Sequence, residues 1–208
     1  MNIREILRLG PVMPVVVIED AATALPLARA LLSGGIRAVE ITLRTPAALD
    51  AIRVIAAEMP EMAVGAGTLL NAQDLRDARA AGAVFGVSPG CTPGLLSAAG
   101  DWPYLPGVMT PSEAMRAFDA GYKTLKFFPA ANAGGPALLR AMSGPLAQAL
   151  FCPTGGITPA SAPEYLALPN VACVGGSWIA PLPLLRTGDW AGISRLAREA
   201  SGLGVTPA

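Results

Sequence analysis

The sequence contains no histidine and only two lysines among its 208 residues. Without histidine, a protein cannot use imidazole as a general base, build Ser-His or Cys-His nucleophile pairs, or form most catalytic zinc sites. Any chemistry must therefore use Lys, Glu, Asp, Arg, Tyr, Cys, Thr or Ser. Arginine carries nearly all of the positive charge, so the two lysines, Lys123 and Lys126, are conspicuous.

Charge is scarce and balanced. Charged residues make up 14% of the chain, the formal net charge is zero, and no basic cluster is present. This composition disfavours nucleic acid and anionic membranes as partners. No apolar run is long enough to span a bilayer, and the first residues contain no signal-peptide core.

The cysteines are few and odd in number. Cys91, Cys152 and Cys173 have no metal-ligand spacing and no Cys-x-x-Cys pattern. We therefore expect free thiols in a reducing compartment and a cytoplasmic location.

Hydrophobic residues make up 52% of the chain, which is enough for one substantial core. No linker, charge block or low-complexity segment divides the sequence. We expect a single domain over residues 1–208, with a short amphipathic helix within residues 1–10 and a frayed tail over residues 202–208.

Short apolar strands alternate with helical stretches along the chain. Eight strands are predicted at Met13–Ile18, Ala38–Leu43, Ala63–Thr68, Val84–Ser88, Tyr104–Val108, Thr124–Phe128, Leu150–Thr154 and Val171–Gly175. This alternation predicts an α/β fold with a parallel sheet, and closure into a (β/α)8 TIM barrel is the most economical arrangement of eight units. The alternative is an open doubly wound sheet, but no dinucleotide fingerprint follows the first strand.

Helix starts are marked by threonine followed by proline. These pairs are Thr45-Pro46, Thr92-Pro93, Thr110-Pro111 and Thr158-Pro159. Each pair would place a hydroxyl at an N-cap and proline at the first helical position. Thr110 and Glu113 also fit a capping box.

Lys126 lies in the middle of the predicted strand Thr124–Phe128. Burial disfavours the ammonium form of a lysine and leaves the free amine, which is the nucleophilic form. The alternative is a lysine at a strand end or edge that extends its amine to solvent.

Alternation in the second predicted strand places Glu40, Thr42 and Arg44 on one face and apolar residues on the other. In a barrel surrounded by helices, the apolar face meets the helices, so the polar face points inward. A buried ion pair is the structural alternative, but such pairs stabilise poorly compared with apolar packing. Functional use is therefore the better interpretation.

Glycines mark the ends of several predicted strands. The last two strands end in Thr154-Gly155-Gly156 and Gly175-Gly176-Ser177, where exposed backbone N–H groups could hold an anion. In (β/α)8 barrels, phosphate frequently binds after strands seven and eight. The alternative is two tight turns without a ligand.

Six motifs together resemble the 2-keto-3-deoxy-6-phosphogluconate (KDPG) aldolase family, which also includes 4-hydroxy-2-oxoglutarate aldolases. The motifs are Glu40-Ile41-Thr42-Leu43-Arg44-Thr45, Gly65-Ala66-Gly67-Thr68, Ser88-Pro89-Gly90, Lys126-Phe127-Phe128-Pro129-Ala130, Phe151-Cys152-Pro153-Thr154-Gly155-Gly156-Ile157 and Gly175-Gly176-Ser177-Trp178. The resemblance runs in unbroken order from about Pro11 to Leu203. It implies a class I aldolase, a metal-free (β/α)8 barrel without a cofactor, assembled as a homotrimer.

The resemblance also implies roles for single residues. Lys126 would form the Schiff base, and Glu40 would shuttle protons. The pyruvate carboxylate would bind Arg44 and Thr68. The remaining contacts would be Pro89 and Phe128 in the pocket, Thr154 as in the gluconate-type enzymes, and Gly155, Gly156, Gly176 and Ser177 at the phosphate.

The implied reaction is cleavage of KDPG to pyruvate and glyceraldehyde 3-phosphate, and also of 4-hydroxy-2-oxoglutarate to pyruvate and glyoxylate. Two other classes of protein share parts of this pattern. One is a different sugar-phosphate barrel enzyme, such as an epimerase or isomerase, although the metal-dependent ones need histidine ligands. The other is a phosphosugar-binding barrel without activity, which the inward Glu40 and Lys126 disfavour.

Overall fold

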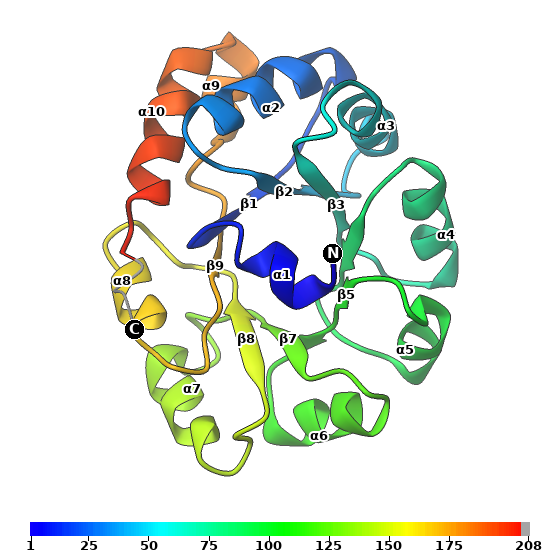
Figure 1. Ribbon diagram of the computed structural model, residues 1–208, viewed down its shortest axis with the longest axis vertical. Helices are drawn as coiled ribbons and strands as arrows, with labels where there is room; N and C mark the ends of the chain where they lie inside the picture. The colour runs from blue at the N-terminus through cyan, green and yellow to red at the C-terminus, as the bar shows by residue number, and fades with distance from the viewer. Residues whose placement is uncertain (205–208) are drawn as a thin grey trace.

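Parallel strands form a ring in the computed structural model, and helices surround the ring (Figure 1). The structure describes residues 1–204. The strands are β1 (Val12–Val16), β2 (Ala38–Thr42), β3 (Ala63–Gly67), β4 (Phe85–Val87), β5 (Tyr104–Leu105), β6 (Gly107–Val108), β7 (Thr124–Phe127), β8 (Leu150–Pro153) and β9 (Val174–Gly176). Proline has no N–H for the ladder, so Pro106 divides the predicted fifth strand into β5 and β6.

The strands follow one another around the ring in chain order. One sheet has the order β5-β4-β3-β2-β1-β9, and the other has the order β6-β7-β8. The chain itself connects β5 to β6, while two isolated bridges, Phe151–Val171 and Thr154–Gly175, join the β8 side to the β9 side. The predicted (β/α)8 barrel is therefore confirmed, and the open doubly wound alternative is wrong. The last strand begins later than predicted, because Val171 forms only an isolated bridge.

Helices cover the outside of the ring. They are α1 (Ile3–Leu7), the short 3-10 helix η1 (Ala21–Thr23), α2 (Ala24–Ser33), α3 (Ala48–Glu58), α4 (Ala72–Ala80), α5 (Pro93–Ala99), α6 (Pro111–Asp119), α7 (Gly135–Ser143), α8 (Ala162–Leu166), α9 (Leu182–Thr187) and α10 (Trp190–Ser201). Figure 1 shows α1 as the exception, because it lies across the ring instead of outside it.

Two of the four predicted threonine N-caps are confirmed. Thr92 caps α5, and Thr110 forms a capping box with Glu113 at the start of α6. The other two predictions are wrong. The hydroxyl of Thr45 donates to the Ile18 carbonyl, and α3 begins only after Ala47. Thr158 accepts a hydrogen bond from the Ser161 N–H in a turn before α8. In both cases the hydroxyl bonds outside the first turn of the helix.

The short N-terminal helix predicted within residues 1–10 is α1, whose capping box joins Asn2 and Glu5. Its buried side chains, Ile6 and Leu7, pack inside the ring. The rest of this inner core comes from inward-facing strand residues: Met13, Ala38, Ala63, Phe85, Val87, Leu105, Cys152 and Cys173. Since Ala38 and Ala63 begin their strands, α1 closes the amino-terminal end of the barrel. The open end is where the strands finish.

A larger outer core joins the sheet to the helices. Val39, Ile41 and Val64 belong to it, as the alternation of apolar and polar residues predicts. Gly202 caps α10, and Leu203 packs against the outer core. The rest of the tail predicted to fray, residues 205–208, lies outside the described residues. Among residues 1–204, no helix has both the length and the hydropathy that crossing a membrane requires.

Candidate active site

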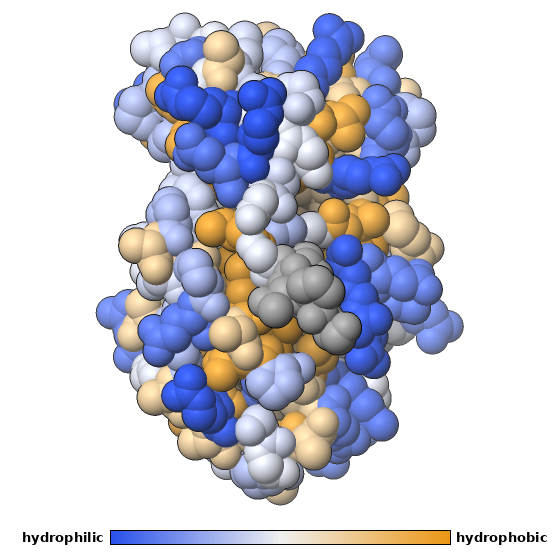
Figure 2. Space-filling view, turned by 60° about the vertical axis from the view of Figure 1, so that its left-hand side comes forward, coloured by the Kyte–Doolittle hydropathy of each residue, from blue (hydrophilic) through white to orange (hydrophobic). Residues whose placement is uncertain are grey.

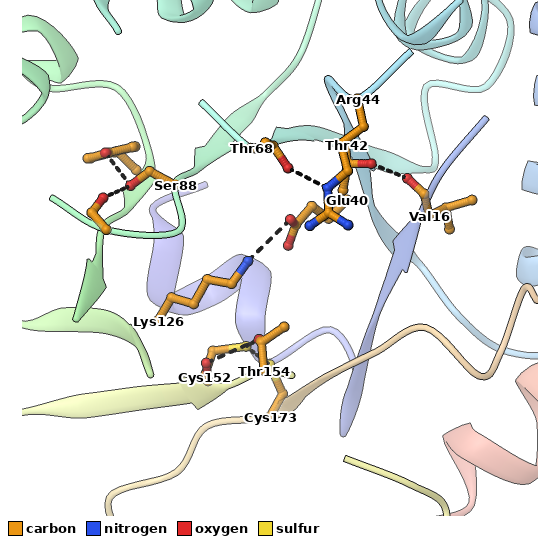
Figure 3. A network of polar contacts seen from close by, with 12 residues as sticks. Val16, Glu40, Thr42, Arg44, Thr68, Ser88, Lys126, Cys152, Thr154 and Cys173 are labelled. Carbon is orange, nitrogen blue, oxygen red and sulfur yellow. Dashed lines mark hydrogen bonds and ion pairs between the residues drawn. The ribbon is translucent and has the colours of Figure 1, made fainter. Parts of the chain in front are cut away.

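Lys126 and Glu40 meet inside the barrel, from strands on opposite sides of the ring (Figure 3). Lys126 Nζ lies 3.4 Å from Glu40 Oε1. The two residues are only 4% and 3% exposed, so solvent screens their interaction little. The predictions that both side chains face inward are confirmed, and the alternative of a solvent-exposed Lys126 is wrong.

Two glycines on β3 make room for side chains inside the barrel, one of them for Glu40. A Cβ atom on Gly67 would lie 2.0 Å from Glu40 Oε1, in the volume that the carboxylate occupies. A Cβ atom on Gly65 would lie 2.3 Å from the Phe85 ring, which packs in the inner core below. Each of these glycines therefore makes room for a specific neighbour.

Arg44 and Thr68 lie beside Glu40 at the open end of the barrel (Figure 3). Arg44 Nε donates to Thr68 Oγ1 at 3.1 Å. Thr68 has a φ of 62°, in the left-handed region, and no other non-glycine residue among 1–204 has a positive φ. Backbone conformations of this kind are costly and occur most often at functional sites. Thr42, the last residue of β2, instead donates to the Val16 carbonyl at 3.0 Å.

Phe128 and Pro89 border the lysine from two further directions. Lys126 Nζ lies 5.3 Å from the centre of the Phe128 ring, within range of a cation–π contact. Pro89 follows β4, and its carbonyl group packs against Gly107 on β6. Gly107 is the ladder partner of Lys126, so the Pro89 turn lies one strand away from the lysine.

The two glycine turns lie side by side at the open end. The bridge between Thr154 and Gly175 places the turn after β8 next to the end of β9. Gly155 and Gly156 have φ values of 101° and 74°, which glycine adopts without strain. Among the backbone hydrogen bonds outside helices and strands in the described residues, none is donated by the N–H groups of Gly156 and Ser177. These N–H groups are available to an anion.

Thr154 itself is buried and faces the interior beside Cys152. Its hydroxyl lies 3.4 Å from the Cys152 carbonyl oxygen and 3.9 Å from the Cys152 sulfur. The sulfur of Cys173 lies 3.6 Å from that of Cys152. The hydrogen bond to Cys152 and the burial of the site raise the pKa of the Cys173 thiol well above its ordinary value. Both cysteines are free and pack in the inner core, as expected from their spacing.

Gly107 and Tyr104 lie close to the site and were not predicted to do so. The sequence contains one signal for Gly107: a glycine within a predicted strand often marks the close approach of another backbone segment. Tyr104 carries no comparable signal, because a tyrosine in a strand is ordinary core.

A separate hollow of about 710 Å³ opens at the opposite, amino-terminal end of the barrel. Its walls include Arg4 and Arg8 of α1 and Leu166 of α8. On the side of the molecule that carries α8 and α10, Figure 2 shows exposed apolar residues flanked by hydrophilic ones. This hollow shares none of its lining residues with the Lys126 site.

A buried lysine beside a carboxylate, at the open end of a (β/α)8 barrel, defines the class of enzymes that break carbon–carbon bonds through an imine. Comparison with known proteins identifies the family. Residues 3–196 match the family model described as "KDPG and KHG aldolase". The chain belongs to this family and is an aldolase, a carbon–carbon lyase, as the motifs predict.

Individual relatives are similar over nearly the whole chain. The KHG/KDPG aldolase of Escherichia coli strain K12 is 53% identical over 197 residues, which cover 94% of this chain and 92% of that protein. A solved KDPG aldolase from Legionella pneumophila has a TM-score of 0.95 at 45% identity, covering 97% of this chain and 99% of that one. That structure holds pyruvate captured as a covalent carbinolamine. The aldolase of Zymomonas mobilis ZM4, solved with 3-phosphoglycerate, has a TM-score of 0.93 at 48% identity, covering 99% and 97% of the two chains.

Proposed function

We propose that this aldolase cleaves KDPG to pyruvate and glyceraldehyde 3-phosphate through an imine on Lys126. The observation that carries the proposal is the buried contact between Lys126 Nζ and Glu40 Oε1 at 3.4 Å. It joins the nucleophile that imine chemistry needs to a group that can accept and return protons. The carbinolamine in the Legionella pneumophila relative supports the same chemistry here.

In the first half of the reaction, the uncharged amine of Lys126 attacks C2 of the substrate ketone. Glu40, in its protonated form, gives a proton to the ketone oxygen as the amine attacks. It then takes up the proton that the nitrogen loses and returns it to the carbinolamine hydroxyl, which leaves as water. The product is a protonated imine, a much stronger electron sink than the ketone.

In the second half, a base removes the proton of the C4 hydroxyl. The C3–C4 bond then breaks, its electron pair moves toward the imine, and glyceraldehyde 3-phosphate leaves. Glu40 is the buried acid–base group beside Lys126, so it is our candidate for this base and for the later protonation of the enamine at C3. Hydrolysis then releases pyruvate and restores the lysine.

The substrate carboxylate would bind Arg44 and Thr68. A guanidinium group binds a carboxylate through two parallel hydrogen bonds. Thr68 already accepts the Nε–H of Arg44, so its own hydroxyl proton is free to donate to a carboxylate oxygen. Pro89, Phe128 and Thr154 would form the walls around the three carbons of pyruvate.

The phosphate would bind the paired turns after β8 and β9. Gly155, Gly156, Gly176 and Ser177 would supply N–H groups and one hydroxyl, which is the usual chemistry of phosphate binding without a metal. The position also fits the common phosphate site of (β/α)8 barrels. Binding at this end would fix the reacting carbons over Lys126.

A second substrate, 4-hydroxy-2-oxoglutarate, is favoured by the similarity to the Escherichia coli KHG/KDPG aldolase. Its cleavage would give pyruvate and glyoxylate by the same steps. It carries no phosphate and would use only the Lys126, Glu40 and Arg44 side of the site.

Borohydride trapping tests the proposal. The full-length protein is incubated with pyruvate, reduced with sodium borohydride, digested, and analysed by mass spectrometry. We expect a pyruvate-derived mass on Lys126 and none on Lys123, the other lysine, which is exposed and serves as an internal control. Lys126→Ala should lose both the label and the cleavage activity, while Lys123→Ala should keep both. A wild-type protein without label would favour an epimerase, an isomerase or a phosphosugar-binding barrel.

We further propose a cytoplasmic homotrimer that takes small phosphorylated 2-keto-3-deoxy acids and needs no cofactor. The three cysteines are free thiols, which supports a reducing compartment. Exposed apolar side chains at Met109 and Met115 offer surface for contact between subunits. Light scattering during size-exclusion chromatography tests the assembly, and a monomeric mass would contradict it.

A further inference from the structure

Two linked hydrogen bonds fix the turn that follows β4 (Figure 3). Ser88 Oγ lies 2.6 Å from the Gly90 carbonyl oxygen and 2.5 Å from the Tyr104 hydroxyl oxygen. A carbonyl oxygen can only accept, so Ser88 donates its single proton to Gly90. Tyr104 must then donate its own proton to Ser88. The order of donation is therefore Tyr104 to Ser88 to Gly90.

This hydrogen-bond chain is rigid at its far end. Ser88 and Tyr104 are 0% and 1% exposed. The Tyr104 ring packs edge-on against Tyr122, with ring centres 5.7 Å apart, and the Tyr122 hydroxyl donates to the Leu96 carbonyl of α5. Burial raises the pKa of Tyr104 to about 12, against the opposing effect of its bond to Ser88. Tyr104 therefore remains a donor throughout the neutral range.

The turn held in this way presses on the strand next to Lys126. A Cβ atom on Gly107 would lie 2.3 Å from the carbonyl carbon and oxygen of Pro89 and 2.6 Å from the Gly90 nitrogen. Backbone atoms cannot move aside cheaply, so the Pro89–Gly90 peptide and β6 are in direct contact. Gly107 is paired with Lys126 in the ladder, and the Lys126 N–H donates to the neighbouring Pro106 carbonyl at 2.9 Å.

We propose that Tyr104 and Ser88 are positioning residues, which hold Pro89 as a fixed wall beside the Lys126 imine. The proposal rests on the proposed function, since it assumes that Lys126 forms the imine. Neither residue touches the substrate. With the wall in place, the imine keeps one orientation toward Glu40. Without it, the imine can rotate, and the proton transfers slow. The phosphate would bind at β8 and β9, away from this turn, so its contribution to KM should change little.

Four variants of the full chain test the proposal. Tyr104→Phe removes the first donor and keeps the ring, Ser88→Ala removes both bonds, and Ser88→Thr keeps a hydroxyl at the same position. Tyr165→Phe is the matched control, because Tyr165 is also a buried tyrosine, on α8. The concentration of active sites is measured by borohydride trapping of Lys126, and kcat and KM for KDPG are expressed per trapped lysine. The exchange of pyruvate methyl protons for deuterium reports proton transfer alone.

We expect Ser88→Ala to lower kcat and the exchange rate on the order of tenfold, since small displacements of reacting groups have effects of this size or larger. Tyr104→Phe should lower both by a smaller factor, Ser88→Thr should recover most of the loss, and KM should stay within about twofold in all of them. Tyr165→Phe should behave as the wild type.

The outcomes separate this proposal from the one it rests on. A role in folding alone would reduce the number of trapped sites and leave kcat per site unchanged, and that result would overturn the positioning role. An equal loss of kcat per site in Ser88→Ala and Ser88→Thr would also overturn the positioning role. If wild-type Lys126 takes no label from pyruvate, the assignment of the imine fails, and the positioning role fails with it. If Ser88→Ala is insoluble, Tyr104→Phe decides, because it changes a single atom.

Discussion

The carboxylate of Glu40 occupies the space where a side chain on Gly67 of β3 would lie, since a Cβ at position 67 would be 2.0 Å from Glu40 Oε1. The acid of the site is therefore placed by a missing side chain as well as by its own strand. Glu40 and Gly67 come from neighbouring strands, β2 and β3, and both are buried.

Gly67→Ala should displace the Glu40 carboxylate from Lys126. We expect kcat to fall on the order of a hundredfold, because a displacement of about 1 Å has this effect on positioned groups. Overpacking should also cost about 1–3 kcal/mol of stability. Steady-state kinetics and urea unfolding measure the two effects. Gly10→Ala is the control, because a Cβ there meets no atom within 4 Å. A Gly67→Ala protein with full kcat would contradict the placement of Glu40 in the reaction.

Glu40→Gln should slow proton transfer more than it slows imine formation. The amide keeps the shape of the side chain and cannot accept a proton, and general acid–base catalysis contributes at least about a hundredfold. Deuterium exchange into the pyruvate methyl group should fall by about that factor, while borohydride labelling of Lys126 should decline less. Equal losses in the two assays would indicate that Glu40 has only a structural role beside the buried lysine.

Ser177→Ala should affect the phosphorylated substrate alone. A hydrogen bond to a charged group contributes about 1.5–3 kcal/mol, so KM for KDPG should rise roughly tenfold or more. Kinetics on 4-hydroxy-2-oxoglutarate should not change, because that substrate has no phosphate. Ser97→Ala, at an exposed serine of α5, is the control and should leave both substrates unaffected. A parallel loss on both substrates would place Ser177 outside the phosphate site.

The capping box of α6 should make stability depend on pH. Burial tends to raise the pKa of Glu113, but hydrogen bonds from the Met109 and Thr110 N–H groups outweigh it, and the pKa falls below its ordinary value. A carboxyl group with a lowered pKa in the folded state stabilises the protein above its unfolded pKa, about 4.3. This stability is lost as the pH falls through the folded-state pKa.

Glu113→Gln provides the comparison for that effect. At pH 7 the wild type should be more stable than the variant by about 1 kcal/mol, the usual contribution of a cap. The difference should shrink steadily below about pH 4. Thermal unfolding of both proteins at several pH values measures it. A difference that stays constant down to the lowest pH would show that the charge of Glu113 is irrelevant.

Local patterns in the sequence predicted some placements that the structure confirms. The alternation of polar and apolar residues along β2 was sufficient to predict that Glu40 faces inward, because the apolar side chains between the polar ones had to meet the helices. The Thr110–Glu113 box was equally predictable, since both partners lie within one helical turn. These features depend on neighbours in the chain.

The features that sequence reasoning missed depend on distant neighbours. Thr45 would have capped a helix in isolation, but the Ile18 carbonyl, on another segment, takes its hydroxyl. The contact between Gly107 and the Pro89 turn arises only when β4, β5 and β6 are already adjacent. No periodicity in a single stretch encodes such an approach. Sequence motifs can indicate which residues share a site, but their contacts follow from the packing of distant segments.

The junction between β8 and β9 has a consequence for the local opening of the barrel. Among the described residues, β8 and β9 share no ladder. Two isolated bridges join the two sides, and one of them links Thr154 to Gly175, at the two turns proposed to hold phosphate. An anion bound by both turns would hold β8 and β9 together at this end of the barrel. Binding at the phosphate site would then stabilise the junction between β8 and β9 against local opening. We therefore expect a sugar phosphate to slow amide hydrogen exchange in β8 and β9 more than pyruvate does.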